Sequence, residues 1–180
     1  MKILGIDPGV ADTGWAVLEQ EPPAGTVRLL ASGIVRTAPV SALPERLHAI
    51  HGELAEVIRA HRPDAVAIEE MFFLKRANTM RATLQARGVI LLAAAQANKL
   101  VVEYNPKHVK MTLTGSGAAE KAQMQKMVQR ILGLAEPLRP DDTADAAAIA
   151  LCHLRSSRYK SLKVLDRVGR DWRDKLPGAK

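Results

Sequence analysis

The chain has 180 residues, of which 47% are apolar, so it can bury one good hydrophobic core and nothing in its composition requires a second folded domain. Its net charge of +7 favours a polyanionic partner, and its single cysteine, Cys152, excludes an intrachain disulfide framework and indicates a reducing compartment. The longest apolar run, residues 89–95, is far shorter than the ~20 residues of a membrane span, so we expect a cytoplasmic protein with no membrane partner.

An apolar run that ends in a carboxylate opens the chain at residues 2–9, KILGIDPG. Its apolar residues predict a short buried strand, which Pro8 and Gly9 end. Asp7 should therefore lie at the carboxyl edge of this strand, where open α/β sheets carry their chemistry. Asp before Pro-Gly is also common in turns, so Asp7 alone does not decide between function and turn formation.

Two further strands are predicted at residues 13–19 and 26–36, on either side of the turn signal EPPAG. The short loops between these first three strands predict an antiparallel meander. From Leu43 onward, apolar residues recur at helical spacing until the sequence RPD at 62–64 ends the pattern. This segment is predicted to be one amphipathic helix.

A second acidic cluster follows the next buried strand, residues 65–68, which runs directly into Glu69 and Glu70. A strand that follows a crossover helix is most easily parallel to its neighbour. Glu69 is therefore expected at the same edge of the sheet as Asp7.

A third acidic cluster, DDTAD at 141–145, opens an alanine-rich helix that can approach a sheet closely. Asp142 and Asp145 are three residues apart and share one helical face, whereas Asp141 is expected to cap the helix. Between the second and third clusters, the sequence predicts a helix at 77–97, a strand at 100–104 and helices at 106–113 and 120–132.

Four carboxylates at one sheet edge would repel one another and raise one another's pKa unless a cation neutralised them. Oxygen ligands without cysteine or paired histidine favour Mg²⁺ or Mn²⁺. Two such ions, about 3.5–4 Å apart, can activate water and stabilise the leaving oxygen in phosphodiester hydrolysis. The acidic clusters thus indicate a two-metal-ion site.

Several short motifs are each weak evidence of a family, but their order and spacing along the chain make them strong evidence together. They are GIDPG at 5–9, AIE at 67–69 with Phe72 after it, QARG at 85–88, VK at 109–110 before Thr112, GSG at 115–117 leading to EK at 120–121, and DxxD at 142–145. With them, the chain from Ile3 to about Cys152 resembles the RuvC family of Holliday junction resolvases. The resemblance implies an α/β, ribonuclease-H-like fold with a mixed five-stranded sheet, in which an antiparallel meander of strands 1–3 joins parallel strands, and helices cover both faces.

The resemblance also implies the roles of seven residues. The catalytic metal ligands would be Asp7, Glu69, Asp142 and Asp145. Lys110 and Lys121 would face DNA phosphates, and Phe72 would stack on or wedge against bases near the cut. The residues by themselves leave open that Phe72 is a core residue and that both lysines are ordinary solvated cations.

We therefore expect a metal-dependent endodeoxyribonuclease that resolves four-way (Holliday) DNA junctions by paired symmetric nicks, in recombination and repair. Two symmetric nicks favour a homodimer, and the family implies a branch-migration helicase complex as a further partner. The alternatives are a ribonuclease-H-like nuclease that trims ribosomal RNA precursors, an actin- or Hsp70-like ATPase, and a non-catalytic nucleic-acid-binding module. The chain is short for the two lobes of such an ATPase and shows no second phosphate loop.

The positive charge is concentrated at the end of the chain. Residues 155–180 hold nine Lys/Arg and three Asp, a net charge of +6, which leaves 17 minus 16, or +1, for residues 1–154. The predicted organisation is a nuclease domain over 1–154 and a loosely packed basic tail over 155–180. A solvated tail is the alternative, but the nearly neutral body favours a tail that contacts nucleic acid.

Overall fold

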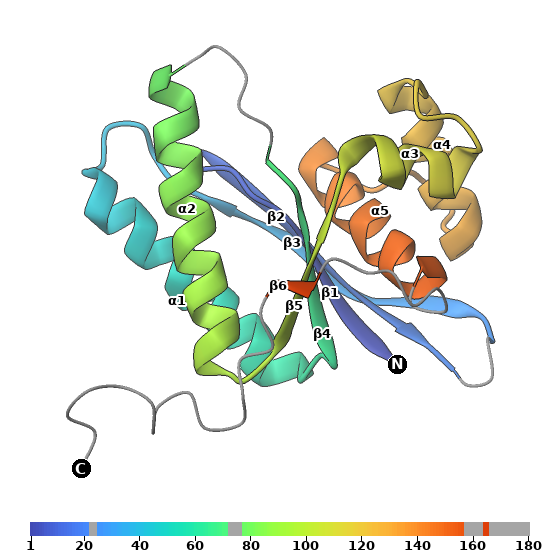
Figure 1. Ribbon diagram of the computed structural model, residues 1–180, viewed down its shortest axis with the longest axis horizontal. Coiled ribbons are helices and arrows are strands. Elements are labelled where there is room, and N and C mark those ends of the chain that lie inside the picture. The colour runs from blue at the N-terminus through green and yellow to red at the C-terminus, as the bar shows by residue number, and fades with distance from the viewer. Residues whose placement is uncertain (22–24, 72–76, 157–163, 166–180) are drawn as a thin grey trace.

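The computed structural model describes residues 1–21, 25–71, 77–156 and 164–165, and it has a β-sheet with helices on both faces (Figure 1). In chain order the elements are β1 (Lys2–Asp7), β2 (Asp12–Gln20), β3 (Val27–Arg36), α1 (Leu43–His61), β4 (Ala65–Glu69), α2 (Ala77–Gln96), β5 (Leu100–Tyr104), α3 (Pro106–Thr114), α4 (Lys121–Leu132), α5 (Asp141–Ser156) and β6 (Val164–Leu165). Within these ranges, none of the helices is both long enough and apolar enough to cross a membrane.

The sheet has the strand order β3-β2-β1-β4-β5-β6. β1 pairs antiparallel with β2 and parallel with β4, and β4 is parallel to β5. The predicted meander followed by parallel strands is therefore confirmed. Because Ile6 is in register with Ile68, the next residues, Asp7 and Glu69, end neighbouring strands at the same edge of the sheet.

The sixth strand was not predicted. Val164 and Leu165 pair antiparallel with Val102 and Val101 of β5, and α5 continues to Ser156. Part of the segment expected to be a loose tail thus adds backbone to the sheet edge. A strand of two residues has no periodic pattern, so sequence periodicity could not have revealed it.

Apolar side chains fill the space on both faces of the sheet. α1 and α2 cover one face with a core that includes Ile50, Leu54 and Ile90. α3, α4 and α5 cover the other face, as the two groups of helices in Figure 1 show. The position of α5 depends on its fully buried alanines and on two strand glycines.

These glycines let the backbone of α5 lie directly on the sheet. A Cβ atom added at Gly5 of β1 would lie 2.1 Å from the carbonyl oxygen of Ala146. One added at Gly14 of β2 would lie 2.1 Å from the carbonyl oxygen of Asp142. Any side chain at either position would therefore push the start of α5 away from β1 and β2.

Candidate metal and nucleic-acid site

Four carboxylates meet at the carboxyl edge of the two central parallel strands. Asp7 ends β1, Glu69 ends β4, and Asp142 and Asp145 lie in the first five residues of α5. One carboxylate oxygen of each of Asp7, Asp142 and Asp145 can be chosen so that all three lie within 4.8 Å of one another. Glu69 lies near enough to this group that its charge raises the pKa of Asp7 and the charge of Asp145 raises its own, so all four predicted acidic residues lie together.

The cluster is electrostatically costly without a cation. Burial, followed by the charges of Glu69, Asp145 and Asp142, raises the pKa of Asp7 to about 8. Burial also raises the pKa of Glu69 and that of Asp145, and in Glu69 the charge of Asp145 adds to the rise. Four neighbouring oxygen-donor groups that cannot all remain ionised fit a hard divalent cation such as Mg²⁺ or Mn²⁺.

Asp141 lies beside this cluster and has two partners that the other carboxylates lack. The sequence predicted that Asp141 would be the capping residue just before the helix. In the structure α5 begins at Asp141, so this residue is the first of the helix. Its carboxylate accepts hydrogen bonds from Gln125 Nε2 at 2.8 Å and from Arg139 Nη1 at 2.9 Å. Asp141 is therefore engaged by neighbouring side chains outside the group of three carboxylates.

Two lysines face the acidic cluster from neighbouring helices. Lys121, the first residue of α4, places Nζ 3.3 Å from Oδ2 of Asp145 and 3.4 Å from Oδ2 of Asp141. Lys110 projects from α3, and its charge opposes the rise in the pKa of Glu69. α3 is fixed at its start by Asn105, whose side chain accepts a hydrogen bond from the N–H of Lys107 at 2.9 Å. Both predicted lysines are thus at the site.

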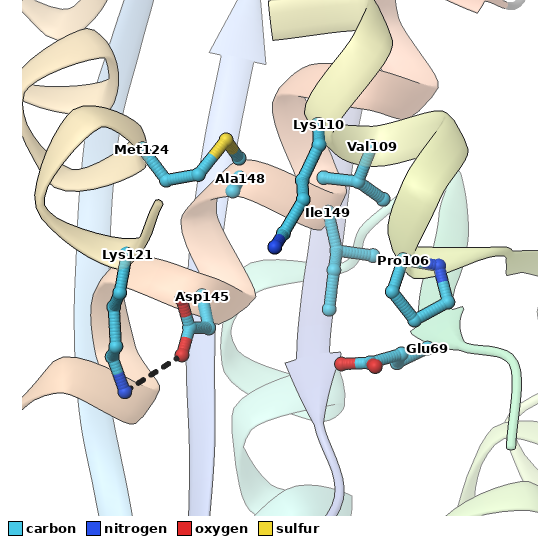
Figure 2. Close-up of a pocket in the computed structure, with 9 residues that line it drawn as sticks. All are labelled: Glu69, Pro106, Val109, Lys110, Lys121, Met124, Asp145, Ala148 and Ile149. Carbon is cyan, nitrogen blue, oxygen red and sulfur yellow. Dashed lines mark ion pairs between the residues drawn. The ribbon is translucent and has the colours of Figure 1, made fainter. Parts of the chain in front are cut away.

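A hollow of about 220 Å³ lies between these groups, and Figure 2 shows Lys110 pointing inward among the lining residues and Lys121 paired with Asp145 at the edge. Its charged lining is Glu69, Lys110, Lys121 and Asp145, and its apolar lining is Pro106, Val109, Met124, Ala148 and Ile149. A second hollow of about 290 Å³ shares Glu69 and Pro106 with the first and is also lined by Asp7 and Met71 among others. Members of the acidic cluster thus line both hollows. Phe72, the remaining predicted site residue, lies outside the described residues.

Sequence reasoning missed a buried ion pair behind Glu69. Arg87 of α2 is only 9% exposed, forms an ion pair with Glu103 of β5, and donates a hydrogen bond from Nη1 to the backbone oxygen of Glu69 at 2.9 Å. The available signal was that Arg87 is the sole charged residue between Arg81 and Lys99, in a stretch that is otherwise apolar or uncharged. Such an isolated charge needs a partner from another element.

Comparisons with known proteins agree with this geometry. The sequence model of the family described as "Crossover junction endodeoxyribonuclease RuvC" matches residues 3–153. A relative with this description from Syntrophomonas wolfei is 48% identical over 161 residues, which cover 89% of this chain and 92% of the relative. The RuvC structure from Thermus thermophilus is 40% identical and has a TM-score of 0.85, with coverage of 92% of this chain and 100% of that one. A second structure, of T. thermophilus RuvC in complex with Holliday junction substrate, is 38% identical with a TM-score of 0.84, at the same coverage of both chains.

Proposed function

Because the chain belongs to the RuvC family of crossover junction endodeoxyribonucleases, we propose that its acidic cluster cuts the strands of four-way DNA junctions by metal-dependent hydrolysis. The observation that best supports this site is the grouping of Asp7, Asp142 and Asp145 within 4.8 Å, with Glu69 at the end of the strand next to that of Asp7. A metal-dependent endodeoxyribonuclease needs such a set of oxygen ligands.

Each acidic residue has a proposed role as a metal ligand. Two divalent ions, when bound, would supply water activation and stabilisation of the leaving 3′-oxygen. Asp7 and Glu69 hold their carboxylates on the rigid ends of paired strands, and Asp142 and Asp145 approach from α5. The chain thus presents the ligands from two packed layers, which keeps their spacing fixed.

Three further residues are proposed to hold the DNA strand. Lys110 and Lys121 reach into the space beside the carboxylates from α3 and α4, where a phosphate must pass to be cut. Their charges would offset the repulsion between that phosphate and the acidic residues. Phe72 follows β4 by three residues, and the family resemblance supports stacking of its ring on a base.

A homodimer is proposed through the exposed face of α2. Leu84 is 38% exposed and Leu92 is 45% exposed, Gly88 lies between them, and the chain has no charged residue from 88 to 98. Small and apolar residues without charge suit a two-fold contact, and a two-fold enzyme suits paired nicks. Leu92→Lys should shift the sedimenting species from dimer to monomer, whereas a wild-type protein that sediments as a monomer would contradict the proposal. A branch-migration helicase complex is a further proposed partner, on the family resemblance alone.

Residues 1–154 are proposed as the nuclease domain and residues 155–180 as a basic segment that adds DNA affinity. The support is the net charge of +6 on the second segment, against +1 on the first. Deletion of residues 166–180 keeps β6 and removes five Lys/Arg and three Asp. It should flatten the dependence of log affinity on log salt by about 0.9 for each phosphate contact that is lost. An unchanged slope would mean that these residues do not touch DNA.

One experiment separates the proposed function from its alternatives. The protein is incubated with a mobile four-way junction, a linear duplex, a single strand and a structured ribosomal RNA precursor, with Mg²⁺ and with EDTA. Metal-dependent paired nicks in the junction alone are expected. Binding without cutting would indicate a non-catalytic module, and cutting of RNA would indicate a processing nuclease. In a parallel incubation with ATP, hydrolysis by the purified protein would indicate the ATPase alternative.

A further inference from the structure

The buried guanidinium of Arg87 lies directly behind the candidate metal site. Its exposed fraction is 9%, and the side chain of its partner Glu103 is 16% exposed. Removing a guanidinium and a carboxylate from water is costly, and apolar residues of similar volume are often as good or better for stability alone. A buried pair at this position therefore calls for a further role.

The second contact of Arg87 suggests that role. Nη1 donates to the backbone oxygen of Glu69 at 2.9 Å, at the point where β4 leaves the sheet. The register between β4 and β1 stops at Ile68, one residue earlier. On its other side, the N–H of Glu70 is bonded to the backbone oxygen of Tyr104 at 2.8 Å. The peptide group that follows Glu69 is thus held at both its oxygen and its nitrogen.

This restraint matters because Glu69 is under electrostatic stress. Its carboxyl is buried and lies near the charge of Asp145, which would favour movement of the side chain away from the cluster. The guanidinium binds the main-chain oxygen of Glu69 and the carboxylate of Glu103, so its effect on Glu69 is exerted through the backbone. Arginine suits this task because its planar fork can donate to two acceptors at once, which a lysine ammonium does less well.

We propose that Arg87, fixed by Glu103, is a positioning residue that holds the end of β4 so that the carboxylate of Glu69 stays in the metal site. The proposal rests on the assignment of Glu69 as a metal ligand in the proposed function. It predicts that Arg87 sets the metal affinity of the site more than it sets the stability of the fold. Residues that orient a metal ligand typically change metal affinity or activity by about 10–100-fold when replaced.

The test compares four variants of the full chain. Arg87→Lys keeps the positive charge but removes the planar guanidinium that donates to two acceptors. Glu103→Gln removes the negative charge that holds the guanidinium of Arg87. Arg87→Met combined with Glu103→Leu replaces the buried pair with apolar side chains that can preserve the fold. Arg28→Lys is the matched control, because Arg28 pairs with Glu19 at 3.2 Å on an exposed surface.

Two measurements of metal dependence are made on each protein, and junction binding in EDTA is measured beside them. The first is the Mg²⁺ concentration that gives half of the maximal rise in Tm without DNA, and the second is the Mg²⁺ concentration that gives half-maximal junction cleavage. We expect both to increase about tenfold or more in Arg87→Lys and in the double variant, and less in Glu103→Gln. Junction binding in EDTA should stay unchanged, and Arg28→Lys should match the wild type.

The outcomes separate this proposal from the function it rests on. Wild-type metal dependence in a folded variant that lacks Arg87 would overturn the positioning role, and so would loss of folding in both such variants, since Arg87 would then serve the fold. Glu69→Gln is measured beside them. If Glu69→Gln cleaves normally, the ligand assignment fails, whereas an inactive Glu69→Gln with normal Arg87 variants leaves that assignment intact and removes only the positioning role.

Discussion

Nζ of Lys121 lies 3.3 Å from Oδ2 of Asp145, so a cation from α4 already occupies one side of the acidic cluster. Burial would lower the pKa of Lys121, but Asp145 and Asp141 outweigh it and raise that pKa, which keeps the ammonium charged. A divalent ion can compete with Lys121 for Asp145, and a DNA phosphate can compete with Asp145 for Lys121. Binding of the metal to Asp145 would leave Lys121 free to face the phosphate.

The lysines should therefore contribute to DNA affinity in a salt-dependent way. Lys110→Gln and Lys121→Gln should each flatten the slope of log affinity against log salt by about 0.9, because each removes one phosphate contact. The measurement uses a four-way junction and an Asp7→Asn background, so that the DNA is not cut. Lys99→Gln is the control, because Lys99 precedes β5 and lies at the opposite edge of the sheet. Equal slopes for all proteins would remove both lysines from the DNA surface.

Each acidic residue should be essential for cleavage. Asp7→Asn, Glu69→Gln, Asp142→Asn and Asp145→Asn should each slow cleavage by more than about 100-fold, since even outer partners of metal ligands cost about 10–100-fold. Junction binding should be equal or tighter, because one charge that repels phosphate is gone. Cleavage and binding are measured on the same junction with Mg²⁺.

The control for these variants is Asp141→Asn, which removes a carboxylate that is held by Gln125 and Arg139 outside the cluster. It should cleave at close to the wild-type rate. If one of the four variants cleaves as fast as Asp141→Asn, the residue replaced in that variant is not a catalytic metal ligand.

Metal-free stability should fall as the pH rises, because of Asp7. Its pKa is about 8 in the folded protein against an ordinary value of 3.8. Below pH 3.8 both the folded and the unfolded chains hold the proton, and between these two values only the folded chain does, so the stabilisation is lost progressively toward pH 8. Asp7→Asn should remove this loss and raise the Tm in EDTA at pH 8 by about 5 °C or more, with a smaller rise at pH 5. An equal effect at both pH values would show that Asp7 is not the titrating group.

The close contact between α5 and β2 should be essential for the site. Gly14→Ala would place a Cβ atom against the backbone oxygen of Asp142, and a displacement of about 1 Å of a reacting group can cost about 100-fold in rate. We expect a comparable loss of cleavage, together with a lower Tm. Gly52→Ala is the matched control, because a Cβ atom there has no neighbour within 4 Å and Gly52 lies inside α1. That change should add about 0.5–1 kcal/mol of stability and leave cleavage unchanged.

The sequence allows part of the site to be predicted, for a definite physical reason. Asp7 and Glu69 follow buried strands, and a crossover helix between two strands favours their parallel pairing. Parallel pairing alone therefore predicts that the two carboxylates lie at one edge of the sheet, and side-chain packing is not needed for this prediction. Asp142 and Asp145 share a helical face, so their common direction also follows from spacing alone.

The remaining contacts depend on packing between distant segments, which no local pattern specifies. The ion pair of Lys121 with Asp145 requires α4 to lie beside α5, and the contact of Arg87 with Glu69 requires α2 to cross the end of β4. A glycine within a buried strand, such as Gly5, is a signal of close backbone approach, but it does not identify the approaching element. The antiparallel β6 likewise has too few residues to show a pattern.

The order of the acidic segments along the chain has a consequence for biosynthesis. Asp7 is made almost at once, but Asp142 and Asp145 belong to α5, which follows all five longer strands. A nascent chain that has not reached residue 141 lacks the helix that packs on β1 and β2, and it lacks half of the candidate ligands. Because such a chain cannot assemble the cluster, a ribosome-bound or prematurely terminated product would be unable to damage DNA before the protein is complete.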